Sequence, residues 1–231
     1  MNNDFVKFPK THYLERMGSR ISREDKVLPY SDAQIFFCEL VSVEEKVDGT
    51  NLGFSISNDG YILVQNRGNY ISSVSHKQYK KLDLWVADHY HALKNILIKD
   101  YILYGEWCYA KHSIQYEYLP DWFLAFDIYD RKCGRFLSRK RRSSILEDTG
   151  ISEVPTLISE KLILKDDLEN LITLKSVLYN GPVEGIYLRI DGDDGYLSYR
   201  AKVVRPEFSQ TIDKHWSKTN IVVNSLAKIN S

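Results

Sequence analysis

The chain has 231 residues, with 31 Lys and Arg against 31 Asp and Glu, so its formal net charge is zero. A neutral chain has no overall attraction for phosphate polymers, and any contact with nucleic acid must come from a local basic patch. Its 3 cysteines and 6 histidines lack C-x-x-C or H-x-x-x-H spacing, which argues against a disulfide framework or a structural zinc site. The odd cysteine count fits a reducing cytoplasm, and no apolar run predicts a signal peptide or a membrane span.

Residues 1–30 are polar and irregular, and we expect them to form a lead-in to a single domain over residues 31–208. Runs of β-branched and aromatic residues at 36–43, 52–57 and 61–65 predict three strands of an antiparallel meander. Residues 77–97 place apolar side chains near the 3.6-residue period, which predicts an amphipathic helix.

The second half of the domain continues with predicted strands at 101–107 and 122–129. Ser138 is a suitable N-cap for a helix that Gly150 ends, and a further helix is expected over 166–178. Segments 184–190 and 196–205 then predict a hairpin around an acidic, glycine-rich link. Antiparallel hairpins with irregularly placed helices predict the α+β class. Residues 209–231 suffice for a short helical tail, without an oligonucleotide-binding barrel.

One lysine lies at a predicted strand end, in the turn Glu45-Lys46-Val47-Asp48-Gly49-Thr50-Asn51. Protonated lysine is a poor nucleophile, so a catalytic lysine needs neighbours or burial that lower its pKa and an electrophile that an amine can attack. The alternative interpretation is a D-G hairpin turn with an ordinary surface lysine beside it.

Further short motifs follow this lysine in a specific order. They are Arg67-Gly68, Tyr104-Gly105-Glu106-Trp107, the segment from Phe123 to Asp130, the segment from Glu184 to Arg189, and Ala201-Lys202-Val203-Val204-Arg205. Over roughly residues 30–208 the succession resembles the covalent nucleotidyltransferases, which include polynucleotide ligases and capping enzymes. This resemblance implies their adenylation fold, with antiparallel sheets flanked by helices. Asn51, in a K-x-x-G-x-N arrangement, is similar to RNA ligases of the RNA ligase 2 group, whereas DNA ligases usually carry arginine there.

The resemblance implies an ATP-dependent RNA ligase that seals 5′-phosphate and 3′-hydroxyl RNA ends through a lysyl-AMP intermediate, with Mg²⁺ or Mn²⁺. It assigns catalysis to Lys46 and Lys202 and metal binding to Glu184. Contacts to the nucleotide fall to Glu45, Asp48, Asn51, Arg67, Glu106, Phe126, Arg200 and Lys202. Arg200 departs from the lysine of the RNA ligase 2 pattern, and its guanidinium keeps the charge without serving as a usable acid. We expect the positive charges of Arg200 and Lys202 to disfavour protonation of Lys46.

A basic cluster at Arg139, Lys140, Arg141 and Arg142 is a candidate track for the RNA backbone, because a neutral chain must build such a surface locally. The alternative is an ordinary solvated helix surface. For Phe126 the alternative role is packing in the core of an apolar strand.

Two other functions remain open at this point. A minimal ATP-dependent DNA ligase would use the same chemistry, although most DNA ligases and capping enzymes carry the barrel that we do not expect here. A non-catalytic RNA-binding module on the same fold would have no need of Lys46, Glu106, Glu184 and Lys202 together.

Overall fold

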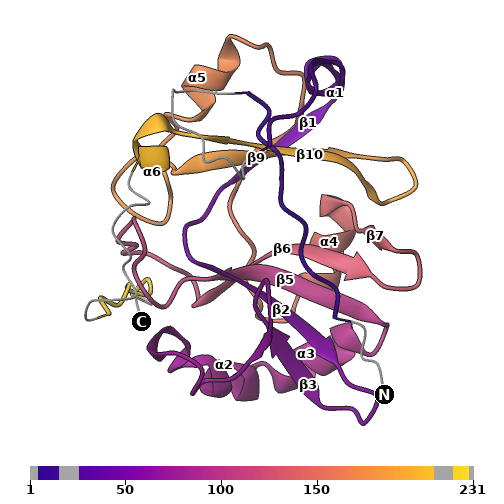
Figure 1. The fold of residues 1–231 in the computed structure, drawn as a ribbon, viewed down its shortest axis with the longest axis vertical. Coiled ribbons are helices and arrows are strands. Elements are labelled where there is room, and N and C mark those ends of the chain that lie inside the picture. The colour runs from indigo at the N-terminus through magenta and orange to yellow at the C-terminus, as the bar shows by residue number, and fades with distance from the viewer. Residues whose placement is uncertain (1–4, 16–25, 211–220, 229–231) are drawn as a thin grey trace.

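The computed structural model describes residues 5–15, 26–210 and 221–228, and in them two antiparallel sheets face each other (Figure 1). The first sheet has the order β10-β9-β1-β8, with β1 at Val41–Glu45, β8 at Thr156–Lys161, β9 at Gly185–Asp191 and β10 at Leu197–Val204. The second has the order β4-β3-β2-β5-β6-β7, with β2 at Thr50–Ile56, β3 at Ile62–Gln65, β4 at Tyr70–Ile71, β5 at Tyr101–Trp107, β6 at Phe123–Asp130 and β7 at Arg135–Phe136. The predicted α+β class is confirmed.

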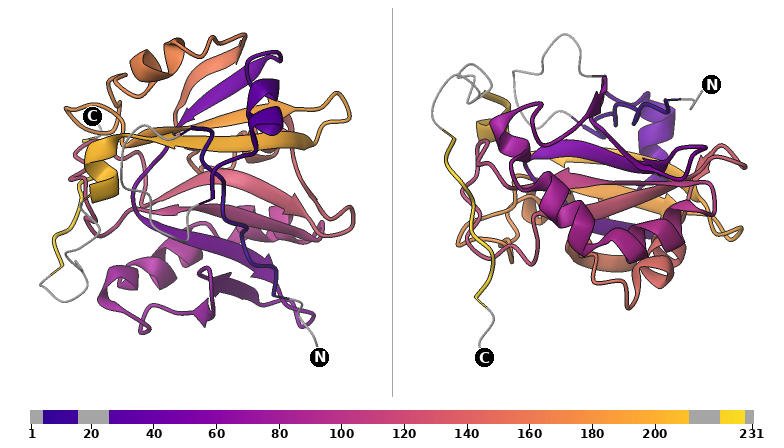
Figure 2. Two further views of the ribbon diagram at one scale, coloured as in Figure 1. Left: turned by 45° about the horizontal axis from the view of Figure 1, so that its top comes forward. Right: turned by 90° about the horizontal axis from the view of Figure 1, so that it is seen from below.

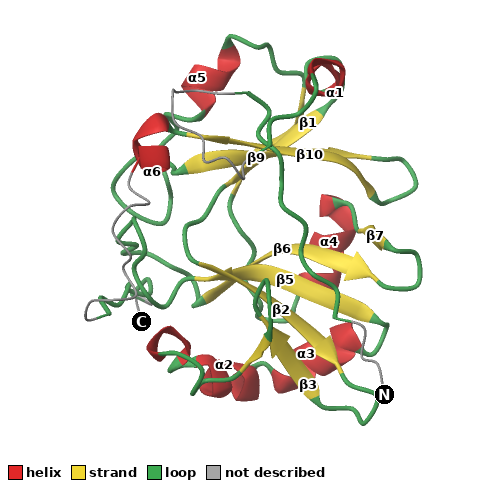
Figure 3. Ribbon diagram, viewed as in Figure 1, coloured by secondary structure: helices red, strands yellow, loops and turns green. Residues whose placement is uncertain are grey.

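Helices cover the outer sides of the two sheets, with α2 and α3 beneath the second sheet and α1 and α5 above the first (Figure 3). The helices are α1 (Tyr30–Ile35), the 3₁₀ helix η1 (Lys77–Tyr79), α2 (Leu82–Asp88), α3 (Tyr90–Leu97), α4 (Arg139–Leu146), α5 (Asp167–Leu171) and α6 (Pro206–Gln210). Figure 2 shows the same layers from two other directions.

Each sheet packs its helices through a hydrophobic cluster of its own. Leu93 and Leu97 of α3 are buried in one cluster with Phe54 of β2, and Leu171 of α5 is buried in another with Val43 of β1. Burial of such side chains contributes about 1.5 to 3 kcal/mol each. The helices thus hold the outer sides of the sheets, and functional side chains gather between the sheets.

The segment that joins β1 to β2 is not a hairpin. β1 pairs with β8 and β9, whereas β2 pairs with β3 and β5. The predicted meander is therefore wrong in its first strand, which begins at Val41 and belongs to the other sheet. Strand propensity is local and does not specify the partner strand. Residues 46–49 consequently cross from one sheet to the other, which places the lysine turn between them.

In two places the observed helices are shorter than the helix that the sequence predicted. Residues 77–97 form η1, α2 and α3, because His89 between α2 and α3 leaves the helical conformation, with its ring stacked on Trp85 at 4.2 Å. Residues 166–178 keep only α5, since the backbone N–H of Val183 bonds Leu174 and draws the following residues into a loop. The N-cap prediction is confirmed, because the Ser138 hydroxyl accepts a hydrogen bond from the Arg141 N–H.

The sequence did not predict the mostly exposed strand β8, and the tail differs from expectation. Residues 221–228 are extended and form bridges between Val223 and Ala110 and between Leu226 and Leu119. The expected helical tail is therefore wrong for this stretch, while 211–220 and 229–231 lie outside the described residues. Across the described part of the chain, no helix has the length and apolar character that crossing a bilayer requires.

Candidate active site

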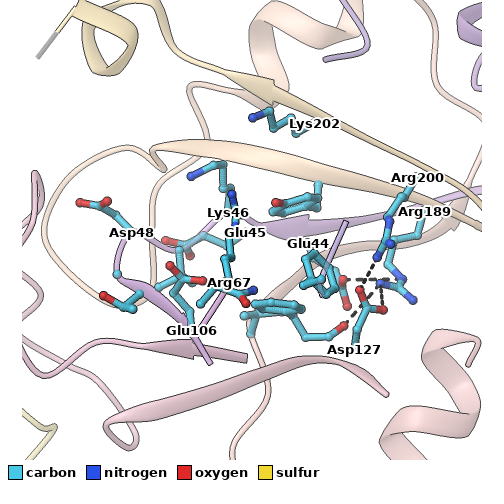
Figure 4. Close-up of a pocket in the computed structure, with 18 of the residues that line it drawn as sticks. Glu44, Glu45, Lys46, Asp48, Arg67, Glu106, Asp127, Arg189, Arg200 and Lys202 are labelled. Atoms are coloured by element: carbon cyan, nitrogen blue, oxygen red, sulfur yellow. Dashed lines mark hydrogen bonds and ion pairs between the residues drawn. The ribbon is translucent and has the colours of Figure 1, made fainter. Parts of the chain in front are cut away.

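A cavity of about 560 Å³ opens between the two sheets (Figure 4). The predicted site residues on its wall are Glu45, Lys46, Asp48, Asn51, Arg67, Glu106, Phe126, Arg200 and Lys202. Glu184 joins them through a direct contact with Lys46. The fold thus brings every predicted nucleotide and metal residue to one place, and the cavity is large enough for a small organic ligand.

Lys46 and Glu184 form an ion pair inside this cavity. The lysine Nζ donates to both carboxylate oxygens, at 2.6 and 2.7 Å. Lys46 follows β1 and Glu184 precedes β9, and the Lys46 N–H donates to the Gly185 carbonyl at 3.0 Å. Charge-assisted hydrogen bonds of this length are strong, so the pair fixes the position of the ammonium group.

The pair sets the protonation state of Lys46. Burial alone would lower the pKa of Lys46, but the Glu184 carboxylate, helped by Tyr187 and Asp48, raises it above its usual value. The pKa of Lys46 is thus raised, which is opposite to the change that we expected from the positive charges of Arg200 and Lys202, because the Glu184 carboxylate has the larger effect. The sequence places the cations on nearby strands, but it does not reveal that a carboxylate contacts the amine directly. Lys46 must leave Glu184 before it can act as a nucleophile.

Asp48 is held by a loop that the sequence did not connect with the site. Its Oδ2 accepts hydrogen bonds from the backbone N–H groups of Ser113 at 2.6 Å and Ile114 at 3.1 Å. Its own N–H donates to the Tyr116 hydroxyl at 2.8 Å. These bonds fix the crossing segment against the loop after β5, so Asp48 orients the turn that carries Lys46.

Two further carboxyl groups of the cavity have raised pKa values. Burial raises the pKa of Glu106 to about 8, although Lys46 and Arg67 oppose the change. Burial also raises the pKa of Glu45 to about 7, against a hydrogen bond from the Ser176 hydroxyl. Nearby carboxylates contribute to both increases. Burial is the main cause of both shifts, so these carboxyl groups keep a proton to a higher pH than usual unless a nearby cation offsets the cost of burying their charge.

Two buried polar atoms at this site are available to a ligand with polar groups. Glu45 Oε2 and Asn51 Nδ2 are buried without a hydrogen-bond partner. Within the described residues, no three His, Cys, Asp or Glu side chains converge on one metal position. Magnesium keeps several waters and uses few protein carboxylates together with phosphate oxygens, so a sparse set such as Glu184 and its neighbours fits it. The site therefore does not resemble a metal site whose ligands all come from the protein.

Arg200 and Lys202 are two residues apart on β10 and both line the cavity, as expected for one strand face. The Arg200 guanidinium lies 4.2 Å from the Phe136 ring centre, and its Nη1 donates to Asp127 Oδ2 at 2.7 Å. The Lys202 Nζ lies 4.1 Å from the centre of the Tyr13 ring. Both cations are thus held in place, at positions from which an anionic ligand in the cavity is accessible.

Phe126 and Arg67 both line the cavity but differ in their exposure to solvent. Phe126 is half-buried on β6, with part of its ring on the cavity wall, and its ring meets that of Phe8 edge-on at 5.1 Å between centres. Phe126 therefore lines the cavity and also packs against a neighbouring ring. Arg67 follows β3 and is exposed at the rim.

The four basic side chains predicted to bind the RNA backbone lie outside the cavity. Three of them, Arg139, Arg141 and Arg142, contact other groups of the protein. Arg142 is 1% exposed, and its guanidinium pairs with Glu44 and Glu153, each at 2.5 Å. Arg139 donates to the Ser159 hydroxyl at 2.7 Å, and the Arg141 guanidinium lies over Tyr196. The assignment of Arg142 to an RNA surface is therefore wrong, because its side chain is buried in the protein. Lys140 alone is well exposed, beside Glu160.

A buried network of charges beside the cavity was not predicted. Arg189 of β9 donates to Asp127 Oδ1 at 2.7 Å, and Asp127 also binds Arg200 through its other oxygen (Figure 4). Arg189 lies 3.8 Å from Glu44, which in turn binds Arg142 of α4. The network joins β1, β9 and β10 of one sheet to β6 of the other. One signal was available, since Arg142 and the apolar Leu146 are four residues apart and so share one helix face.

Comparison with known proteins gives one family and one fold. A family model described as RNA ligase matches residues 39–204. No curated protein gives a significant match. Three similar solved structures are all of a Naegleria gruberi RNA ligase. A mutant with ATP and Mn has a TM-score of 0.67 and 16% identity, and the match covers 91% of this chain and 59% of that one. The ligase with PPi (TM-score 0.62, 19% identity, 90% of this chain and 61% of that one) and a mutant with AMP and Mn (TM-score 0.65, 16% identity, 91% of this chain and 59% of that one) are similar to it as well. The chain thus spans about three fifths of those structures' length, and at these identities the likeness establishes the fold.

Proposed function

This chain belongs to the RNA ligase family, and we propose that it is an ATP-dependent RNA ligase that joins a 5′-phosphate end to a 3′-hydroxyl end through a lysyl-AMP intermediate on Lys46. The observation that carries the proposal is the position of the Lys46 amine. It lies in a cavity of suitable size and donates to Glu184, and two cations of β10, Arg200 and Lys202, line the same cavity. A purely structural lysine would not need this combination.

The reaction would proceed through three displacements at phosphorus. The Lys46 amine loses its proton and attacks the α-phosphorus of ATP, so that an N–P bond forms and the bond to pyrophosphate breaks. An oxygen of the RNA 5′-phosphate then takes the AMP, and the lysine nitrogen leaves and regains a proton. Finally the 3′-hydroxyl attacks the activated phosphate, loses its proton and releases AMP. Alignment and charge stabilisation supply most of the catalysis in such transfers.

The cavity residues would divide this work by their chemistry. Lys202 and Arg200 would bind the phosphates, since their positive charges compensate the charge of the triphosphate and of the transition state. The ring of Phe126, which lines the cavity, would stack on the adenine, an interaction worth roughly 1 to 3 kcal/mol. Asn51, Glu106 and the rim residue Arg67 would contact the ribose or ordered water, because these polar residues line the cavity together with the two cations of β10.

Mg²⁺ or Mn²⁺ would be held by Glu184, with Asp48 and Glu106 acting directly or through water. A bound divalent cation would supply charge neutralisation at the α-phosphate, and Glu184 would then bind that cation in place of the Lys46 ammonium group. Lys46 released from that carboxylate has a lower pKa and is a better nucleophile. The structural neighbours with ATP or AMP and Mn support this choice of ligands.

RNA is the proposed substrate, and the cytoplasm is the proposed location. The family match supports RNA over DNA, and the three free cysteines, Cys38, Cys108 and Cys133, are compatible with a reducing compartment. A minimal DNA ligase remains the competing enzyme. The two are separated by nicked substrates whose 3′-hydroxyl strand is RNA in one case and DNA in the other, since an RNA ligase should prefer the first.

The decisive experiment is to incubate the protein with α-labelled ATP and Mg²⁺ or Mn²⁺ and then to denature it. A lysyl phosphoramidate keeps its label in alkali and loses it in acid. Lys46→Ala should abolish the labelling while the protein still unfolds cooperatively, and the matched control Lys99→Ala, at an exposed lysine remote from the cavity, should not. Absence of acid-labile label on the parent protein would rule out the proposed enzyme, and label on Lys46→Ala would rule out the proposed nucleophile.

A further inference from the structure

The N-terminal segment 5–15 connects the two sheets beside the cavity. At one end, the Val6 carbonyl accepts hydrogen bonds from Gln65 Nε2 at 2.8 Å and from the Tyr104 hydroxyl at 2.5 Å, both from the second sheet. At the other end, residues 12–14 pair with β10 of the first sheet. Figure 1 shows this segment in indigo, running from the upper sheet to the lower one. The sequence had suggested a polar lead-in without a role.

The pairing with β10 is centred on Lys202. The Lys202 N–H donates to the His12 carbonyl at 3.0 Å, and the Leu14 N–H donates to the Lys202 carbonyl at 2.9 Å. Between these two bonds lies Tyr13, a buried residue whose ring centre is 4.1 Å from the Lys202 Nζ. The segment therefore holds both the backbone of Lys202 and its ammonium group, and an aromatic face attracts a cation at this distance.

Phe8 makes a corresponding contact with the second cation. It is 3% exposed yet forms part of the cavity wall, and its ring centre lies 4.7 Å from the Arg200 guanidinium. The same ring packs edge-on against Phe126. A single short segment thus touches Lys202, Arg200 and Phe126, the residues to which we assign the phosphates and the base.

We propose that Tyr13 and Phe8 of the N-terminal segment are positioning residues of the nucleotide site: Tyr13 positions the Lys202 ammonium, and Phe8 positions the Arg200 guanidinium and the Phe126 ring. This inference rests on the proposed function, because it assumes that ATP is the ligand of the cavity. The segment does no chemistry itself. It fixes the distance between groups of the two sheets that must act on one ligand, which lowers the cost of ordering them on binding.

The test for Tyr13 is a double-mutant cycle with Lys202, measured as the dissociation constant for ATP. All variants carry Lys46→Met, so that binding is not followed by adenylylation. Tyr13→Leu should weaken ATP binding about 3- to 10-fold when Lys202 is present, which corresponds to a cation–π contribution. In the Lys202→Met background the same change should have little effect. Tyr13→Phe keeps an aromatic face and should bind ATP as the parent does.

Equal weakening by Tyr13→Leu in both backgrounds would overturn the role of Tyr13, as would a Tyr13→Phe variant as weak as Tyr13→Leu. Thermal unfolding of each variant separates a general loss of stability from the specific coupling, since a structural role would shift unfolding equally in both Lys202 backgrounds.

The test for Phe8 compares Phe8→Leu with Phe5→Leu, a control on the same segment whose ring packs on Tyr70 and does not line the cavity. In the otherwise unchanged protein, Phe8→Leu should raise KM for ATP in self-adenylylation and lower kcat, whereas Phe5→Leu should leave both near the parent values. Equal effects of the two changes would refute the role of Phe8. If the parent protein neither binds ATP nor becomes labelled, the proposed function itself is refuted. If the parent and all the variants are labelled normally, only the positioning role is refuted.

Discussion

The backbone carbonyl of Trp107 occupies the space that a side chain on Gly49 would need. A Cβ atom at Gly49 would lie 2.5 Å from that oxygen, closer than any normal contact, and 3.1 Å from Glu106 Cγ. The glycine of the lysine turn is thus required because β5 passes directly against the crossing segment, three residues after Lys46.

Gly49→Ala should therefore displace the crossing segment and greatly reduce self-adenylylation. Overpacking of this kind costs about 1 to 3 kcal/mol, so urea unfolding should show a lower stability as well. Gly68→Ala is the matched control, because a Cβ atom at Gly68, the residue after Arg67, would meet no atom closer than 3.9 Å. Normal labelling of Gly49→Ala would show that the segment adjusts without moving Lys46.

Glu184→Gln should make Lys46 more reactive towards an amine-specific reagent while it lowers adenylylation. Loss of the carboxylate removes the main interaction that raises the pKa of Lys46, so a larger fraction of the amine is neutral at a given pH. That fraction rises about tenfold for each unit of decrease in the pKa. Peptide mapping after brief trinitrophenylation measures it, with Lys99 as the internal reference. Unchanged reactivity of Lys46 would mean that another group holds its proton.

Arg142→Gln should destabilise the fold strongly, and Lys140→Gln should not. Removing Arg142 takes from the buried Glu44 the cation that binds it directly and leaves it only Arg189, at 3.8 Å, and breaking a buried pair costs about 3 to 5 kcal/mol. Lys140 pairs with Glu160 at the exposed surface, where an ion pair contributes about 0 to 1 kcal/mol. Urea unfolding of the two variants, two residues apart on α4, checks the difference. Similar stabilities would show that the network relaxes around the loss.

The protein without ligands should lose stability as the pH rises from 4.5 to about 8, and Glu106→Gln should reduce that loss. The folded state raises the pKa of Glu106 from 4.5 to about 8, so over this interval the unfolded chain releases a proton that the folded protein retains. The stabilisation is complete below 4.5 and gone above about 8. We expect an effect on the order of 2 kcal/mol, because water in the open cavity weakens the shift. Parallel pH profiles of parent and variant would contradict this assignment.

Phe126→Leu should keep the fold and weaken ATP binding by roughly 1 to 3 kcal/mol, since leucine fills the apolar part of the position but has no flat face for the base. Isothermal titration with ATP measures the affinity, and thermal unfolding serves as the control for packing. Equal ATP affinity of variant and parent would leave Phe126 with a packing role alone.

The location of the site could be predicted from the sequence because its residues belong to short motifs that each follow or lie on a recognisable strand. The resemblance to covalent nucleotidyltransferases, which the order of these motifs carries, implied that Lys46, Glu106, Glu184 and Lys202 share one site, and the structure brings them together at one cavity. The partner of each strand could not be predicted, because strand propensity is a local property of the sequence. The prediction consequently assigned β1 to the wrong sheet. The direct contact of Lys46 with Glu184 depends on that pairing and was missed for the same reason.

The basic cluster shows a different limit. It consists of four consecutive basic residues, Arg139, Lys140, Arg141 and Arg142, and their charge alone does not distinguish one from another. On a helix they point in different directions, and only the spacing from Arg142 to Leu146 distinguishes the inward one. The N-terminal segment was overlooked because extended single residues that pack on a distant strand leave no periodic pattern.

The buried charge network constrains how this sequence can change. Its members carry three positive and three negative charges, on Arg142, Arg189 and Arg200 and on Glu44, Asp127 and Glu153. A single substitution that alters one charge leaves an opposite charge stranded in the interior, whereas a matched double substitution to apolar residues of similar volume can be neutral. Related sequences should therefore exchange these residues in oppositely charged pairs, so that Glu44 and Arg142 vary together or not at all.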